Sequence, residues 1–351
     1  MRLYRQELAS NNALIIIISA IVSVLGTRLF LEAAGYPIIG RGMWHLSHTI
    51  WGGILMIVGM FMVVSFYGRK NVRVSCAIFG VGMGMFMDEI GKFVTRDNNY
   101  FFKPTSMMIY ILFLILFGIY RLLVRQSHEN GMHLFYHVLD RLGDLAENDL
   151  DEREQKKLVE IMQLLRSRSH YELATFSHEL EKALSKLSPK QYNQSLTRKI
   201  TRKILGGVYK KVLAKKGVLI FLIVLTSIYS IGSIADTVWL MSNIRNIDMS
   251  ILLGNYSPAN GFEAYLLVVK ILSDLLVAGM FLLGIGLTIS RRYKSGLDFF
   301  EDGLIIYILL TTVCRFYFEQ FNAVLGLMFS LLVLVFIRQL KVEKKAESGI
   351  I

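Results

Sequence analysis

Residues 45–93 read HLSHTIWGGILMIVGMFMVVSFYGRKNVRVSCAIFGVGMGMFMDEIGKF, two apolar stretches joined by the basic hinge RKNVR at residues 69–73. Each stretch holds about twenty residues, the length that an α-helix needs to cross a hydrocarbon core of about 30 Å. Imidazole and carboxylate side chains stand at the ends opposite the hinge. The pattern predicts two adjacent membrane-spanning helices with a polar cluster at one end.

The whole chain has the composition of a membrane protein. Its 351 residues are 54% hydrophobic and 19% charged, whereas a soluble domain is about a quarter charged. The charges crowd into residues 121–217 and into short hinges, which leaves long apolar runs between them. Cys76 and Cys314 both lie inside apolar runs, where cysteine behaves as a small hydrophobic residue, so neither is given a role.

Eight apolar segments are predicted to span the membrane, so the fold class is an all-α, polytopic helical membrane protein. Seven or nine spans remain as alternatives, because the last two segments are separated by a short break and a re-entrant hairpin would also fit them. The predicted spans are 11–32, 44–66, 73–93, 105–123, 217–240, 262–290, 299–317 and 320–338.

The spans form two groups of four around a charged segment. The first half of the membrane domain is 1–123, the charged helical segment is 124–216, the second half is 217–340, and 341–351 is a tail. Lys and Arg are in excess on the cytoplasmic side of membrane proteins, and every basic loop falls on that side if both termini do. The sequence therefore predicts a multi-pass protein of the cell membrane with cytoplasmic termini and a cytoplasmic segment 124–216.

The two halves share a short internal match. Residues 59–61 and 279–281 both read GMF, each is followed by a basic hinge, and KF at 92–93 corresponds to RF at 315–316. Both halves begin on the same side, so the match favours a parallel four-plus-four repeat, an arrangement that some transporters use. A chance match is the alternative in a chain rich in Gly, Met and Phe.

Ionisable side chains within spans are functional candidates, because each costs about 2.5–3.5 kcal/mol at mid-membrane. On the predicted topology most of them lie toward the extracytoplasmic face. His48 and Gly52 share one face of their helix, and Gly84 and Asp88 share one face of the next. If these glycine-bearing faces meet, the imidazoles and carboxylates converge. Further polar candidates are Lys92, Asp236, Asp274, Arg315 and Glu319.

The converging groups predict a metal site. Two imidazoles with one or two carboxylates form a ligand set that a divalent transition metal such as Zn, Fe, Mn or Ni accepts. The predicted ligands are His45, His48, Asp88 and Glu89. A proton relay is an alternative, because histidine titrates near neutrality. Plain boundary packing is another, with Asp88 and Lys92 paired at i,i+4.

Three motifs carry a resemblance to a known group. They are HTIWG at 48–52, GVG at 80–82 and DE at 88–89. Over residues 44–93 the chain resembles a group of bacterial multi-pass membrane proteins of unassigned function, which share a His-x-x-Trp-Gly span followed by a Gly-rich span ending in Asp-Glu. In that group a second histidine often directly precedes the first, whereas Ser47 stands there in this chain. The resemblance implies that these positions belong together and brings no activity.

The charged segment suggests partners. Residues 182–216 contain eleven Lys or Arg and no acidic residue, so they are predicted to contact anionic lipids of the cytoplasmic leaflet, at about 1 kcal/mol per basic residue. No groove-reading or aromatic-interleaved motif accompanies them, so nucleic-acid binding is not predicted. Apolar residues recur at helical spacing in the segment, which predicts helices with one buried face and leaves a cytoplasmic protein partner open.

Three functions follow from these features. A transporter or ion-coupled carrier is favoured by the internal match and by the titratable groups near the outer face. A membrane-embedded, metal-dependent hydrolase acting on a lipid or envelope precursor is the second, with the metal activating water. A membrane scaffold or regulator acting through its cytoplasmic helices is the third.

Overall fold

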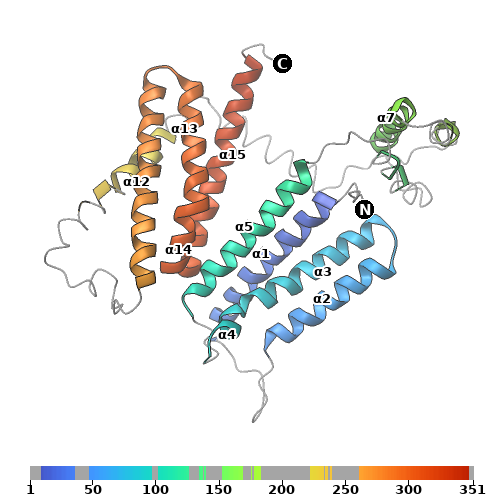
Figure 1. Cartoon of the computed structure of the whole chain (residues 1–351), viewed down its shortest axis with the longest axis horizontal. Helices are drawn as coiled ribbons and strands as arrows, with labels where there is room; N and C mark the ends of the chain where they lie inside the picture. Colours follow the sequence, from blue (N-terminus) through green and yellow to red (C-terminus); the bar gives the residue numbers. More distant parts are fainter. Residues whose placement is uncertain are drawn as a thin grey trace, which may run out of the picture. The chain divides into compact units, whose positions relative to one another are not determined.

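The computed structural model describes helical elements throughout, and no strand occurs among the described residues (Figure 1). Contacts divide the chain into two compact units, Met1–Tyr100 with Leu112–Ser195 (unit 1) and Phe101–Ile111 with Leu196–Ile351 (unit 2). The described residues are 9–35, 47–96, 102–125, 152–168, 222–232 and 261–347, with short pieces within 134–139, 175–182 and 234–238.

Five of the described helices are long and apolar enough to cross a membrane, by length and composition. This agrees with the predicted all-α membrane class, since each has at least eighteen residues and therefore about 27 Å or more of helix. The five lie in α1 (Ala9–Ala33), α2 (His48–Ser65), α5 (Pro104–Arg125), α12 (Gly261–Ile289) and α15 (Ala323–Glu347).

The other three predicted spans do not reach this standard and stay predictions. Helix α3 (Arg69–Asp88) has the length, but it begins with basic residues and ends on a carboxylate. The apolar helix Leu222–Gly232 is shorter. The predicted span 299–317 falls in α13 (Tyr293–Ile306), the π-helical element η1 (Tyr307–Thr311) and α14 (Thr312–Phe318), which follow one another without a break.

Glycines allow α3 to pack closely against both α1 and α2 in unit 1. A Cβ atom on Gly82 would lie 2.5 Å from the carbonyl oxygen of Gly52 in α2, and one on Gly80 would lie 2.5 Å from the carbonyl oxygen of Ile16 in α1. Neither distance is tolerated by a real side chain, so only glycine permits this approach. The α1 side of the contact also holds a hydrogen bond from Ser23 Oγ to the Val81 carbonyl, at 2.8 Å.

The glycine faces therefore meet differently from the sequence prediction. Gly52 meets Gly82, whereas Gly84 faces Ala20 and Ser23 of α1. Residues two positions apart on an α-helix point about 200° apart. The run GVGMG can for this reason serve one neighbouring helix with its central glycine and another with its outer glycines.

The predicted internal repeat gains no support from the glycines that begin its two GMF motifs, Gly59 and Gly279. A Cβ atom on Gly59 would lie 2.8 Å from the amide nitrogen of Phe79, while one on Gly279 would meet nothing within 4 Å among the described residues. The two glycines therefore have unlike surroundings, and the repeat stays a prediction.

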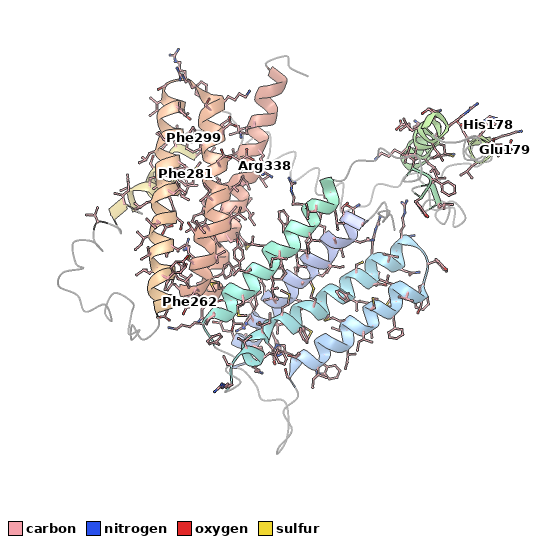
Figure 2. All side chains as sticks on the ribbon, in the orientation of Figure 1. His178, Glu179, Phe262, Phe281, Phe299 and Arg338 are labelled. Carbon is pink, nitrogen blue, oxygen red and sulfur yellow. The ribbon has the colours of Figure 1, made fainter. Side chains whose placement is uncertain are left out.

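Unit 2 packs α12 against α13, η1 and α14, and packs α13 against α15. Aromatic side chains take part in the contact: Phe281 of α12, labelled in Figure 2, lies 6.3 Å from Phe300 of α13 between ring centroids. The start of α5 joins this unit, where Tyr110 stacks on Phe316 at 4.5 Å. The buried core of unit 2 consists of Leu222, Val277, Phe281, Leu297, Phe300, Leu304, Tyr307, Ile308, Val333, Ile337 and Leu340.

Charged residues tie the last turns of α15 to α13. The Lys341 ammonium contacts the carboxylates of Asp298 and Glu301, and Arg338 Nε donates to Glu301 at 2.8 Å. Partial burial alone would lower the pKa of Lys341, but the hydrogen bonds to both carboxylates outweigh it and raise that pKa. Helix α15 continues to Glu347, past residue 338 where the predicted span ends.

The described part of the segment 124–216 is helical. Helix α7 (Glu152–Arg168) buries Leu158, Met162 and Leu165 against Leu134 and Val138. The spacing of four and three is that of one helical face, as the sequence predicts. Most of the basic cluster at 182–216 lies outside the described residues.

The paired glycines of α2 provide a test of this packing. Gly52→Ala is expected to lower the thermal stability of the purified protein, because the new Cβ would lie 2.8 Å from the Gly82 carbonyl oxygen and 2.9 Å from the Phe86 nitrogen. Gly53→Ala is the control, since among the described residues nothing lies within 4 Å of a Cβ there. Equal unfolding midpoints for the two variants would contradict the close α2–α3 contact.

Candidate functional site

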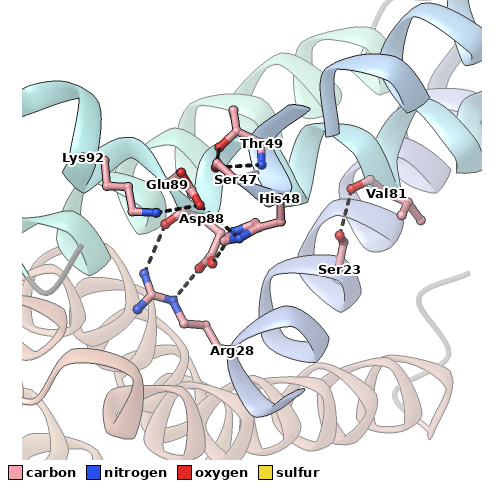
Figure 3. Close-up of polar contacts among 9 residues, drawn as sticks. All are labelled: Ser23, Arg28, Ser47, His48, Thr49, Val81, Asp88, Glu89 and Lys92. Atoms are coloured by element: carbon pink, nitrogen blue, oxygen red, sulfur yellow. Dashed lines mark hydrogen bonds and ion pairs between the residues drawn. The ribbon is translucent and has the colours of Figure 1, made fainter. Parts of the chain in front are cut away.

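A cluster of charged side chains lies at the ends of α1, α2 and α3 (Figure 3). Arg28 comes from the second half of α1, His48 is the first residue of α2 and Asp88 is the last residue of α3. Glu89 occupies the turn before α4 (Ile90–Val94), which carries Lys92. Asp88 has 0% of its surface exposed and Glu89 has 2%, so both carboxylates depend on protein groups rather than water.

Local sequence explains how these side chains come together. Ser47 caps α2, because its Oγ accepts a hydrogen bond from the Thr49 amide at 3.2 Å. Helix α3 ends where Glu89 leaves helical geometry, with φ −94° and ψ 9°, and the chain resumes as helix at Ile90. The predicted span 73–93 is therefore interrupted at Glu89, and this turn lets two consecutive carboxylates reach one imidazole.

His48 is held between those two carboxylates. Its Nε2 lies 3.1 Å from Asp88 Oδ2, and its Nδ1 lies 3.0 Å from Glu89 Oε1. Both ring nitrogens donate only when both carry hydrogen, which is the imidazolium form. The geometry accordingly fits a cationic His48.

Two further cations complete the cluster. The Arg28 Nε donates to Asp88 Oδ1, and Arg28 Nη2 donates to the Asp88 backbone carbonyl at 3.1 Å. Lys92, which the sequence places at i,i+4 from Asp88, pairs with Glu89 at i,i+3, with Nζ 2.9 Å from Oε1. Cations from α1, α2 and α4 thus compensate two buried carboxylates, as desolvated charges require.

The predicted metal site is assembled in part. His48, Asp88 and Glu89 lie together, whereas His45 lies outside the described residues. Within the part of the chain that the structure describes, no three His, Cys, Asp or Glu side chains are arranged to hold a metal. Both His48 nitrogens face carboxylates, so a metal would displace one of these contacts. The metal site stays a prediction.

A second polar group lies midway along α12 in unit 2. The Lys270 ammonium is 3.0 Å from Asp274 Oδ2, and the Tyr229 hydroxyl donates to Asp274 Oδ1 at 2.8 Å. The side chains of Lys270 and Asp274 are 29% and 16% exposed. At 1.5 Å per residue, Asp274 is about 20 Å from either end of α12. Asp274, one of the polar candidates from the sequence, therefore lies deep within its helix.

Polar and aromatic contacts continue from Asp274 to the end of α14. The Tyr229 ring meets Tyr307 edge-on, with 5.6 Å between centroids. The Tyr307 hydroxyl accepts a hydrogen bond from Arg315, which binds both Glu319 oxygens at 2.8 and 2.7 Å. Tyr307 begins the π-helical element η1, and π-helical turns are frequent at functional sites. One series of contacts therefore links three residues that the sequence proposes: Asp274, Arg315 and Glu319.

Sequence reasoning missed several members of these groups. Arg28 is an ionisable residue near the end of an apolar run, and nothing in one sequence shows that it reaches Asp88. Lys270 could have been found from the sequence, because it stands at i,i+4 from Asp274 in an apolar run and that spacing predicts an ion pair. Tyr229 and Tyr307 gave no such signal, because tyrosine is ordinary in such helices. Asp236 lies outside the described residues.

Comparison with known proteins gives no match: no family model, no curated protein and no solved structure is significantly similar to this chain. The chemistry of the two polar groups therefore carries the functional argument.

Asp88→Asn is expected to destabilise the protein by about 3 kcal/mol, because it leaves the partly buried Arg28 and His48 with a neutral neighbour. Chemical unfolding in detergent measures this. Asp298→Asn is the matched control: its half-exposed carboxylate contacts Lys341, and its loss should cost less than about 1 kcal/mol. A smaller loss for Asp88→Asn than for Asp298→Asn would mean that the cluster does not hold the helix ends together.

Proposed function

We propose that the protein is an ion-coupled membrane carrier with both termini on the cytoplasmic side. The Lys270–Asp274 pair in the middle of α12 carries this proposal, because α12 is long and apolar enough to span a membrane. Charged groups at such depth are costly and lie mostly on ion or substrate pathways. Stability alone gives no reason for the pair, since apolar residues often replace a buried ion pair without loss.

The surroundings of the pair support the proposal. Toward one end of unit 2, contacts lead through Tyr229 and Tyr307 to Arg315. Toward the other end, Phe281 and Phe300 pack together in the buried apolar core. On the proposed topology the polar end is extracytoplasmic and the apolar end cytoplasmic. Polar contacts on one side and an apolar barrier on the other suit a carrier that is closed toward the cytoplasm.

The cluster around Asp88 has a supporting role in this proposal. It lies on the proposed extracytoplasmic side and joins the ends of α1, α2 and α3. The basic residues 182–216 then face the cytoplasmic leaflet, where anionic lipids would hold them.

Uptake by reconstituted liposomes tests the carrier proposal. Under an imposed proton or sodium gradient, the wild type is expected to accumulate some members of a panel of radiolabelled organic and inorganic ions. Asp274→Asn and Lys270→Met should each reduce uptake by about tenfold or more, because each leaves a buried charge or donor uncompensated.

Asp298→Asn serves as the control in this assay, because it removes a carboxylate of unit 2 outside the series of contacts that begins at Asp274. Its uptake should equal that of the wild type. Failure of the folded wild type to accumulate any member of the panel would contradict the carrier function.

Metal-dependent hydrolysis of a lipid or envelope precursor is a second candidate. It draws on the contacts of His48 with Asp88 at 3.1 Å and with Glu89 at 3.0 Å, and it requires that a metal displaces at least one of them. A metal there would activate water for attack on an ester or phosphoester. The scaffold hypothesis lacks such support, because the described part of α7 buries its apolar face within the segment itself.

Metal content of detergent-purified protein tests the second candidate. After metal-replete purification, a hydrolase predicts stoichiometric metal in the wild type and its loss in both His48→Ala and Asp88→Ala. Lys92→Met is the control, since an ammonium is no metal ligand and the variant should keep its metal. A metal-free, folded wild type would exclude the hydrolase and leave the charge cluster as a structural element.

A further inference from the structure

We propose that the Lys270–Asp274 pair binds a proton and an anionic substrate group together, with the proton on the Asp274 carboxylate and the anion at the Lys270 ammonium. The proposal rests on the carrier function and assigns its coupling ion and substrate class. Two features support it: the contacts that the two Asp274 carboxylate oxygens make, and the change in net charge of the pair when Asp274 is protonated.

The contacts at Asp274 favour a proton over a metal cation. Oδ2 faces the Lys270 ammonium at 3.0 Å, and Oδ1 accepts the Tyr229 hydroxyl at 2.8 Å. A sodium ion would have to displace the ammonium, gather further oxygen ligands and remain beside that positive charge. A proton needs one carboxylate oxygen and no further ligand.

Protonation changes the charge balance of the pair. A proton from water forms an O–H bond on Asp274, the carboxylate becomes neutral, and its ion pair with Lys270 is lost. The ammonium then lies within an apolar helix without its counter-ion, which is strongly unfavourable. An anionic group that binds at Lys270 Nζ restores neutrality, so the net charge of the site is zero in both states.

Proton and anion binding therefore favour each other. Linkage requires that the anion strengthens proton binding by the same factor as the proton strengthens anion binding. When the proton returns to water, Asp274 regains its negative charge, pairs with Lys270 and competes with the anion. The pair itself thus couples release of the anion to release of the proton.

The neighbouring groups are compatible with this exchange. Tyr229 of the helix Leu222–Gly232 donates to Asp274, its ring contacts Tyr307 of η1, and the Tyr307 hydroxyl accepts from Arg315 of α14. Cys314 of α14 lies within electrostatic range of Asp274 and Lys270. Arg315 is itself paired with Glu319 at 2.7 Å, so its charge is largely compensated. The hydroxyl of Tyr229 can donate to a carboxylate and also accept from a protonated carboxyl group, which suits both states.

Proton uptake by the purified protein tests the proposal without any transport step. A panel of monocarboxylates, dicarboxylates and inorganic phosphate is added to weakly buffered, detergent-solubilised protein at constant ionic strength. The wild type is expected to take up about one proton for each anion bound. Asp274→Asn and Lys270→Met should lose this uptake, while Lys341→Met, which removes another ammonium of unit 2, should retain it.

Infrared difference spectra after a pH jump locate the proton. The carbonyl band of a protonated carboxyl group is expected in the wild type, absent in Asp274→Asn, and present at higher pH in Lys270→Met, because the cation that stabilises the carboxylate is gone. Each of three results would overturn the proposal: a band that persists in Asp274→Asn, proton release on adding sodium in place of uptake on adding anions, or no uptake with any anion of the panel. Sodium-driven uptake in liposomes would overturn it while leaving the carrier function intact.

Discussion

The carboxylate of Asp88 has no contact with solvent, and a carboxylate in that position needs cationic partners from neighbouring helices. Those partners are Arg28 of α1 and His48 of α2. Both side chains reach Asp88 only if their helices lie very close to α3. Gly80, Gly82 and Gly84 have no side chains that would prevent this approach. Charge compensation at Asp88 therefore depends on the close helix packing of unit 1.

Unit 2 compensates its partly buried carboxylate in another way. Asp274 takes its cation from its own helix, one turn away at Lys270, and takes a neutral hydroxyl from Tyr229. No second helix has to supply a charge for this pair to form. The helices around it are joined by aromatic packing instead, with Phe281, Phe300 and Tyr307 in the core. A change of charge at Asp274 therefore need not pull helices apart.

Much of the helical architecture could be predicted from sequence, because long apolar runs and their charged ends fix where helices begin and end. The helices α1, α2, α5 and α12 lie close to the predicted spans. The turn at Glu89 could not be predicted, since it depends on tertiary contacts of that carboxylate with His48 and Lys92. A sequence pattern shows which residues share a helical face, but not which neighbouring helix that face meets.

The same limit applied to the candidate sites. Asp88, Glu89 and His48 were recognisable because charges at the ends of apolar runs are uncommon, and they do converge. Arg28 is sixty positions from Asp88 in the chain, and only the fold brings it there. Tyr229 and Tyr307 could not be recognised from the sequence for a different reason. Their importance comes from a single hydroxyl contact each, with Asp274 and with Arg315, and residue type alone does not reveal such a contact.

The two charged groups differ in what it takes to change them, and this difference assigns their roles. Releasing Asp88 breaks contacts to Arg28 and to His48, which stand on separate helices, and leaves both cations in a largely buried place. Releasing Asp274 from Lys270 breaks a contact within one helix, at a more exposed position. In the proposed exchange the proton and the anion compensate the two charges that separate. A site that must exchange ions in each transport cycle has to change state at low energetic cost. Under the proposed carrier function the pair in α12 meets that condition, whereas the cluster at Asp88 holds helix ends together.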